Sequence, residues 1–383
     1  MEVFYNKLIY FLERFLNHRY WHVTVAFITV LVILFLNAPS YFALTKEFKP
    51  CSDCVNFQEV INRADHLFKP TKYAEYSHMA NTQFRLTVPL IAKLIGTRSK
   101  IVIFIIQEIL GIIFLIITCL LSFRLTNDKI ISAIITLSFG FIYAGKSAFV
   151  DMEGLLDSFA YFFMILALFA SNKPLILSSL ILAYFTDERA FLSSSLVAVF
   201  YFLEFLDTNN GKINFYAFFK ARIFYVVLSW ILCLITRFIL FKIYGLYTPK
   251  SAAITFDLHQ LGDIFWDGLK GFWLLLILGI VHLIIQKRFF ILLLLTISIL
   301  VVVIATCMVY DLTRSIAYIF PVIFVSLYLT AKAINKSQLL KIAIISCLIS
   351  FLSVDSYFVS SGKPRYYQSA PIKIIEKVVL HEH

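Results

Sequence analysis

The chain alternates apolar runs with short polar connections along almost its whole length. Most runs are long and unbroken, which is typical of helices that cross a membrane and differs from the short alternating segments of a membrane β-barrel. We therefore predict an all-α fold, a polytopic transmembrane helical bundle of about 11 spans, although several runs are shorter than the roughly 20 residues of a full crossing. The predicted spans are 21–44, 101–123, 130–148, 159–170, 175–185, 191–205, 223–241, 272–285, 289–309, 316–329 and 342–354.

One polar interruption, residues 45–100, is far longer than the others. Within it, apolar side chains recur at helical spacing over 57–68, where Pro70 stops the pattern, and again over 84–95, where Gly96 is suited to a C-terminal cap. We expect two helices on the outer membrane surface. Because loops of more than roughly 12 to 15 residues are uncommon and often functional, we expect this loop to form much of an active site.

Composition supports a membrane protein and argues against nucleic acid as a partner. The chain is 60% hydrophobic and 15% charged, with a mean hydropathy of +0.85, outside the range of soluble domains. Its net charge is +11, but the basic residues are scattered between spans without interleaved aromatics. With a cytoplasmic N-terminus they gather in the inner loops, as the positive-inside rule requires. We expect an integral protein of a bacterial inner membrane, in contact with membrane lipid.

The expected organisation is one integral membrane domain over 1–383. Residues 1–20 form an amphipathic cytoplasmic segment, 45–100 the large extracytoplasmic loop, 101–354 the remaining transmembrane helices and 355–383 an extracytoplasmic tail. The first apolar run lacks a small-residue cleavage site, so we expect it to persist as an anchor.

Cys51 and Cys54 form a CxxC motif in the large loop. Redox catalysis would require a thioredoxin-like βαβ setting, which the pattern does not indicate. Zinc would require two more ligands, which His66 and His78 could supply, although their spacing matches no standard site. A local disulfide or two free thiols is the simpler expectation.

Acidic residues gather in the outer turns. Asp151, Glu153 and Asp157 lie within seven residues. A helix boundary explains Asp157 as a cap or first-turn acid, but three acids are more than capping requires. A shared outward-facing site would explain the excess.

Two further turns combine acids with arginine. Asp187, Glu188 and Arg189 stand between two apolar runs with almost no loop. Charges so close to the bilayer are expensive and are either functional or mutually paired. The second turn repeats this arrangement with Asp311 and Arg314 on the same side.

The segment between the two loop helices, TKYAEYSHMANTQFR, holds His78 and Arg85 among tyrosines and amides. This mixture suits sugar hydroxyls and phosphate, because the planar guanidinium group offers paired donors to an anion. A merely solvated loop is the alternative.

These features resemble the GT-C superfamily of integral-membrane glycosyltransferases. The chain shares a first span followed by a long outward loop with two helices, many short-looped spans, and charged turns facing one side. The stretch VDMEGLLDSFAYFFMILALFASNKPLILSSLILAYFTDERAFL is similar to the family's outer acidic loop, two spans joined by a basic inner turn, and outer charged turn. Family members carry an acid or acidic pair soon after the first span. Here only Glu47 and Asp53 stand nearby, whereas the adjacent pair, Asp187 and Glu188, lies far downstream.

The resemblance implies transfer of a sugar from a polyprenyl-phosphate carrier to a glycan, lipid or protein acceptor outside the cytoplasmic membrane. An acid would act as general base, with Asp53 expected first and Glu59 and Asp65 as alternatives, while arginines would stabilise the leaving phosphate. The residues do not establish a cofactor, and the acid-rich outer face leaves Mg²⁺ or Mn²⁺ open. The residues expected to bind substrate are His78, Arg85, Asp151, Glu153, Asp187, Glu188, Arg189, Asp311 and Arg314.

Other classes of protein remain open on the sequence alone. A polymerase or ligase of lipid-linked glycans would share the many spans and outward arginines, but usually has its large loop late in the chain. A transporter would require polar residues along a path at mid-membrane depth, where this chain is poor in charge. A purely structural or assembly role is a further alternative.

Overall fold

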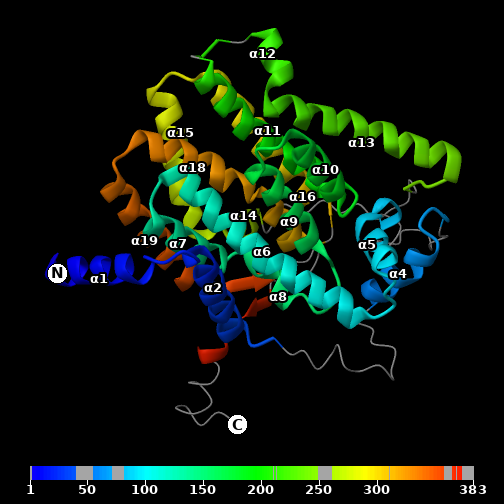
Figure 1. Cartoon of the computed structure of the whole chain (residues 1–383), viewed down its shortest axis with the longest axis horizontal. Helices are drawn as coiled ribbons and strands as arrows, with labels where there is room; N and C mark the ends of the chain where they lie inside the picture. Colours follow the sequence, from blue (N-terminus) through cyan, green and yellow to red (C-terminus); the bar gives the residue numbers. More distant parts are fainter. Residues whose placement is uncertain are drawn as a thin grey trace.

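The chain folds into a bundle of helices, seen in a computed structural model that describes residues 2–39, 55–70, 82–209, 211–212, 214–248, 261–309, 311–357, 365–367 and 369–372 (Figure 1). The strands in this part of the chain are β1 (Asp355–Tyr357) and β2 (Arg365–Tyr367), an antiparallel pair in which Ser356 is opposite Tyr366. The predicted helical class is confirmed, with this small sheet as an addition.

The N-terminal region supplies α1 (Glu2–Phe15) and α2 (Trp21–Asn37), and the predicted large loop contributes α4 (Val55–Asp65) and α5 (Thr87–Ile95). Both helices expected within the loop are thus present, and Gly96 caps α5 in the left-handed conformation as predicted. The apolar face of α4, including Phe57 and Ile61, is buried within the protein. This helix therefore packs on the bundle through the face that the sequence pattern identified.

The remaining helices vary widely in length. They are α6 (Lys100–Thr126), α7 (Lys129–Phe139), α8 (Tyr143–Val150), α9 (Asp157–Phe169), α10 (Lys173–Tyr184), α11 (Glu188–Thr208), α12 (Phe215–Lys220), α13 (Arg222–Tyr244), α14 (Leu261–Leu269), η3 (Lys270–Phe272), α15 (Trp273–Ile285), α16 (Phe289–Cys307), α17 (Leu312–Ile316), η4 (Ala317–Ile319), α18 (Pro321–Ala333) and α19 (Lys336–Leu352).

Six helical stretches within the described residues are long and apolar enough to cross a membrane, and α7 with α8 adds a seventh if this pair, bent by 59°, is one span. The predicted count of about 11 is not confirmed, because α2, α9 and α10 are apolar but have only 10–17 residues. The six stretches are Lys100–Thr126, Glu188–Thr208, Arg222–Tyr244, Gly262–Ile285, Phe289–Cys307 and Leu312–Ala333.

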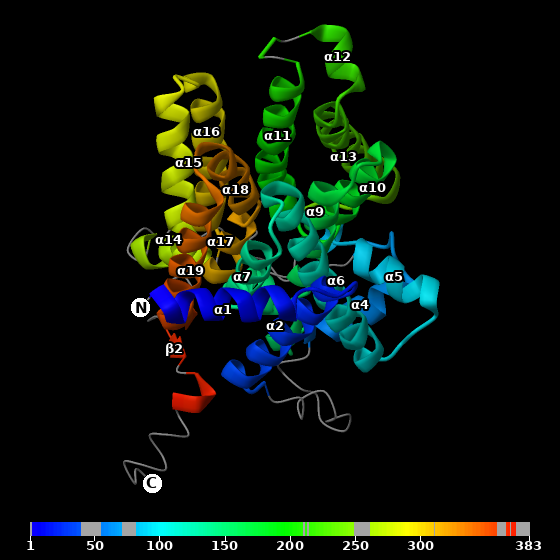
Figure 2. The ribbon, with the colours of Figure 1, turned by 60° about the vertical axis from the view of Figure 1, so that its left-hand side comes forward.

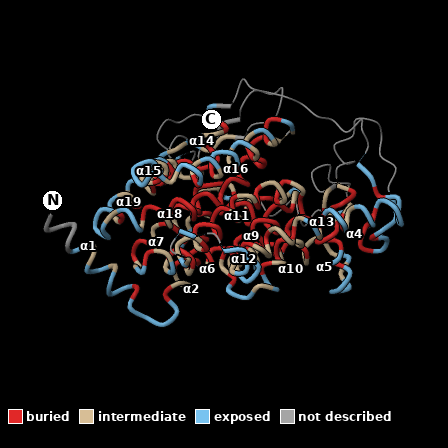
Figure 3. The backbone as a smooth tube through the Cα atoms, turned by 90° about the horizontal axis from the view of Figure 1, so that it is seen from above, coloured by how far each residue is buried: buried red, intermediate tan, exposed pale blue. Residues whose placement is uncertain are grey.

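Burial differs sharply between helices of similar apolarity. In α9, 11 of 13 residues are buried, whereas α13 exposes a row of large apolar side chains that includes Leu234, Ile235 and Phe238. Figure 3 shows the buried positions gathered inside the bundle and the exposed ones on the outer helices. A continuous apolar surface of this kind suits contact with lipid, so α13 has the character of a peripheral helix and α9 that of a core helix.

Charged side chains lie at both ends of α11. Arg189 is in its first turn and Asp207 in its last, about 27 Å apart at the rise of an α-helix, close to the roughly 30 Å of a bilayer's hydrocarbon core. In Figure 2 the α11 helix runs from the level of α9 and α10 toward α12. The candidate functional site lies at its N-terminal end.

Candidate functional site

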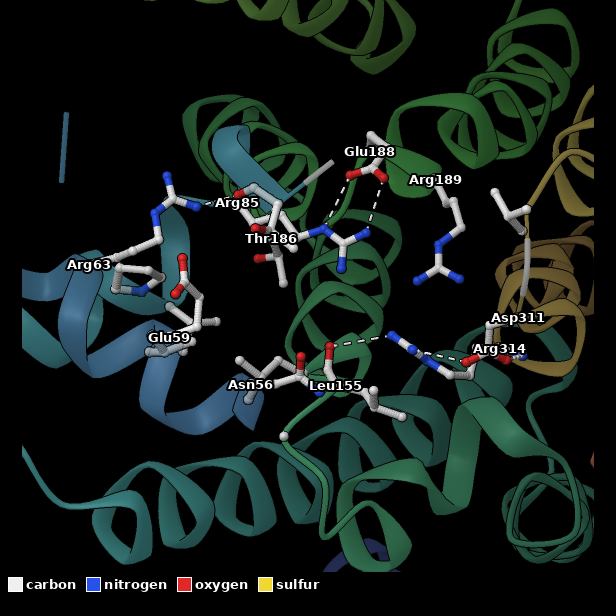
Figure 4. A pocket seen from close by; sticks show the side chains of 17 residues that line it. Asn56, Glu59, Arg63, Arg85, Leu155, Thr186, Glu188, Arg189, Asp311 and Arg314 are labelled. Carbon is white, nitrogen blue, oxygen red and sulfur yellow. Dashed lines mark hydrogen bonds and ion pairs between the residues drawn. The ribbon is translucent and has the colours of Figure 1, made fainter. Parts of the chain in front are cut away.

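A cavity of about 280 Å³ lies where α4, α5, the loop before α9, the start of α11 and α17 meet (Figure 4). Most of these elements are distant in sequence, and their polar side chains converge on the cavity. It is lined by Asn56, Glu59, Val60, Arg63, Thr82, Arg85, Val88, Pro89, Gly154, Leu155, Leu156, Thr186, Glu188, Arg189, Val309, Asp311 and Arg314.

Asp157 is the centre of a buried network beside this cavity. Its side chain is 1% exposed, and its Oδ1 accepts a hydrogen bond of 2.7 Å from Arg189 Nη2. The other carboxylate oxygen, Oδ2, accepts from Arg314 Nε, and Tyr318 donates its hydroxyl to Oδ1 at 3.2 Å. One carboxylate therefore joins α9, α11, α17 and η4.

The arginines of this network have their donors engaged by the protein. Arg189 donates to both oxygens of Asp187 at 2.7 Å and through Nη1 to Ser315 Oγ at 2.7 Å. Arg314 Nη1 donates to Asp311 Oδ2 at 2.9 Å. Because these guanidinium groups are held on several sides, they position the wall of the cavity and contribute positive charge to it.

Local sequence explains why the two charged turns adopt this geometry. Asp187 is the N-cap of α11, and its Oδ1 accepts the backbone N–H of Arg189 at 2.9 Å. Asp311 is likewise the N-cap of α17 and accepts from the backbone N–H of Arg314. Caps of this kind satisfy backbone donors at a helix start, so each aspartate orients both its helix and the arginine two or three residues later.

The loop before α9 is tied together by Asp151. Its Oδ1 and Oδ2 accept the backbone N–H groups of Glu153 and Leu156, each at 3.1 Å. Burial of this carboxyl raises its pKa to about 6, and the neighbouring Asp157 adds to the rise against the opposing effect of Arg314. Leu156 adopts φ 65°, a conformation that is costly for a branched side chain and requires support from its surroundings.

Arg85 is the most accessible arginine of the network, with a side chain that is 25% exposed. Its Nε and Nη2 donate to the two oxygens of Glu188 at 3.2 and 3.0 Å, and Nη2 also lies 3.0 Å from Asp187. Burial opposes the charge on Arg85, but the two carboxylates outweigh burial and raise its pKa. Likewise, Arg189 and Arg85 overcome the burial of Asp187 and hold the pKa of that carboxyl well below its usual range.

The structure brings together six of the residues predicted from the sequence. Asp151 and Asp187 are buried and do not line the cavity, and the carbonyl oxygen of the exposed Glu153 accepts a hydrogen bond from the side chain of Asn56. The six that line the cavity are Glu59, Arg85, Glu188, Arg189, Asp311 and Arg314.

Other predicted residues lie elsewhere. Asp65 does not line the cavity and instead forms a 3.1 Å ion pair with the exposed Arg98. The predicted general base Asp53, together with His78 and the CxxC pair, lies outside the described residues.

Sequence reasoning gave Asp157 too small a role. It is indeed a first-turn acid, but Leu156 is the N-cap of α9 and the Asp157 carboxylate binds two arginines instead. Arg63 was also missed: its guanidinium donates to the carbonyl oxygens of Thr82 and Gln83 and ties α4 to the segment before α5. The signal for Asp157 was present in the crowding of three acids, whereas Arg63 had none beyond its helical position.

The described residues offer a poor site for the Mg²⁺ or Mn²⁺ left open above. Among them, no group of three or more His, Cys, Asp or Glu side chains is arranged around a common point. The carboxylates of Asp157, Asp187, Glu188 and Asp311 are already bound by arginines, with which a metal cation would have to compete.

The cavity combines carboxylates, a partly accessible guanidinium group and apolar walls at the end of an apolar helix. Such a site can bind an anionic group and accept a proton from a hydroxyl. No protein-family model, curated protein or solved structure with which the chain was compared matches it.

Proposed function

We propose that the chain is a membrane glycosyltransferase that moves a sugar from a polyprenyl-phosphate donor to a glycan, lipid or protein acceptor on the extracytoplasmic face. The observation that supports this proposal is the convergence of Glu59, Arg85, Glu188 and Arg314 on one cavity at an end of α11. A lipid-linked substrate presents its phosphate and sugar at the membrane surface, which is where the end of a spanning helix lies. The large loop would then face outward, and the shorter apolar helices would complete the predicted set of spans.

Arg85 is the best-placed contact for the donor phosphate. Among the described residues, its Nη1 has no acceptor, whereas Arg189 uses all three of its guanidinium nitrogens on protein groups. Charge-assisted hydrogen bonds from guanidinium to phosphate are strong. Arg85 would therefore stabilise the negative charge that develops on the leaving phosphate, with Arg189 and Arg314 as positioning residues.

Glu59 is the best-placed general base among the described residues. It lies on α4 and lines the cavity. Its carboxylate would take the proton of the acceptor hydroxyl as the hydroxyl oxygen forms a bond to the anomeric carbon. The bond from that carbon to the phosphate oxygen would break, and the carrier phosphate would leave with the electron pair.

A transfer assay on the purified full chain, with a panel of polyprenyl-phosphate sugars, tests this function. We expect Glu59→Gln to lower the rate by about 10² to 10⁴ and Arg85→Gln by about 10² to 10³. Asp65→Asn, on the same helix but away from the cavity, is the matched control and should retain the wild-type rate.

Absence of transfer from every donor in the panel, combined with solute uptake by the reconstituted protein, would overturn the proposal in favour of a transporter. Full activity of Glu59→Gln together with loss of activity in Asp53→Asn would assign the role of general base to Asp53. Full activity of both variants and of Asp65→Asn would remove the base from this loop altogether.

A further inference from the structure

A second charged cluster lies at the C-terminal end of α11, and the proposed transfer reaction does not use it. Arg222 donates to Glu204 at 3.0 Å, Arg288 donates to Asp207 at 3.1 Å, and Lys332 also donates to Asp207. Two carboxylates on α11 thus engage three cations from three other elements. The cluster comprises Lys173, Glu204, Asp207, Lys220, Arg222, Arg288 and Lys332.

A hollow of about 850 Å³ opens within this cluster and carries more positive than negative charge. Lys173 and Lys220 line it together with two of the paired cations. Neither lysine has a carboxylate partner within the described residues. Instead, Lys220 Nζ lies 4.1 Å from the centre of the Tyr216 ring and Lys173 Nζ lies 5.8 Å from that of Tyr225. These two ammonium groups remain able to bind an anion.

The helix beside this hollow, α12, is apolar and aromatic, yet none of its residues is buried. Phe215 is 76% exposed, Tyr216 68% and Phe219 44%. Figure 2 shows α12 beyond the end of α11, connecting it to α13. Exposed aromatic rings next to lysines are typical of a segment in the headgroup region of a bilayer, where the rings meet acyl chains and the cations meet phosphate.

We propose that this hollow binds the phosphate of an anionic phospholipid headgroup, with Lys173 and Lys220 as its contacts and the α12 rings placed in the adjoining acyl boundary. Basic pockets between membrane helices are known to hold such headgroups. Free phosphate would satisfy the lysines equally well, but it would leave the exposed rings of Phe215 and Phe219 in water. The lipid therefore accounts for both features of this end of the molecule, independently of the reaction proposed for the other end.

Native mass spectrometry of the detergent-purified full chain tests this inference. The probes are phosphatidylglycerol, zwitterionic phosphatidylcholine and inorganic phosphate as a competitor. We expect phosphatidylglycerol to bind more tightly than phosphatidylcholine, and Lys173→Gln and Lys220→Gln each to weaken its binding by roughly fivefold. Lys287→Gln, an exposed lysine in the turn between α15 and α16 that does not line the hollow, is the matched control and should leave binding unchanged.

Equal binding of the two lipids would overturn the proposal. It would also be overturned if Lys173→Gln and Lys220→Gln reduce the affinity for phosphatidylglycerol no more than Lys287→Gln does. Displacement of phosphatidylglycerol by inorganic phosphate at equal concentration would reassign the hollow to free anions. Because both lysines are at least partly exposed, their substitution should leave the fold intact, and an unchanged circular-dichroism spectrum checks this.

Discussion

Asp157 balances two buried guanidinium groups, Arg189 and Arg314, through one carboxylate. The change Asp157→Asn keeps the side-chain volume but removes the charge, and loss of one partner from a buried ion pair costs about 3–5 kcal/mol. We expect the free energy of unfolding to fall by about this amount in a denaturant titration of the purified protein. Asp65→Asn, which breaks an exposed pair, should cost less than about 1 kcal/mol. Equal stability of the two variants would show that Asp157 does not hold the network together.

The buried Asp151 should make stability depend on pH. Its pKa rises from 3.8 to about 6 on folding, so between these values the folded chain binds the proton more tightly than the unfolded chain does. Raising the pH from about 4 to about 6 therefore removes stability, by about 3 kcal/mol in total, and the loss is complete above about 6. In Asp151→Asn this contribution is absent. We expect the wild-type free energy of unfolding, minus that of the variant, to decrease across this range; a constant difference would contradict the assignment.

At the scale of single residues, the sequence predicts contacts within a turn and misses contacts across the fold. The sequence allows two interpretations of the charged turn at Asp187, a functional role or an ion pair with Arg189. The two residues are only two positions apart, and the structure contains the pair. The pairing of Asp157 with Arg314, 157 positions apart, depends on how α9 and α17 pack. No local pattern encodes that distance, so charge crowding could indicate a site at Asp157 but could not identify its partners.

Placement of α4 depends on a glycine in the loop that precedes α9. Gly154 has φ 75°, and a Cβ there would lie 2.5 Å from the Phe57 ring. We expect Gly154→Ala to displace α4, lower the thermal unfolding temperature and reduce transfer activity through Glu59. Gly96→Ala is the matched control: Gly96 has φ 72° but no atom within 4 Å of the added carbon. The control should lose only the stability that corresponds to backbone strain, about 1–2 kcal/mol. If Gly154→Ala loses no more stability than Gly96→Ala, the close contact between Gly154 and the Phe57 ring does not determine the placement of α4.

At the scale of elements, periodicity located the helices but could not assign their surroundings. The apolar pattern of 57–68 identified the buried face of α4 correctly. The run 159–170 was predicted to be a span, yet α9 has 13 residues and most of them are buried inside the protein. Apolar side chains satisfy lipid and protein interior equally well, so an apolar run alone cannot distinguish them. The sequence also does not predict the 59° bend between α7 and α8, because the apolar run continues through the bend.

At the scale of the whole molecule, the two ends of α11 differ in the balance of their charges. At the N-terminal end, Arg85, Arg189 and Arg314 are matched by carboxylates. At the C-terminal end, cations exceed carboxylates around the hollow that Lys173 and Lys220 line. Basic residues concentrate on the cytoplasmic side of membrane proteins. Applied to this chain, the rule predicts that the C-terminal end of α11 faces the cytoplasm and that the candidate site faces outward.

Single-cysteine labelling tests this orientation. Lys93 on α5 and Lys287 in the turn between α15 and α16 are both exposed, and they lie toward opposite ends of the bundle. In a background with the six native cysteines replaced by serine, we expect a membrane-impermeant maleimide to label Lys93→Cys on intact cells. Lys287→Cys should react only after the membrane is permeabilised, because the positive-inside rule places its turn in the cytoplasm. The reverse pattern would invert the orientation and place the transfer site on the cytoplasmic face, whereas labelling of both from one side would show that α11 does not separate two faces of a membrane.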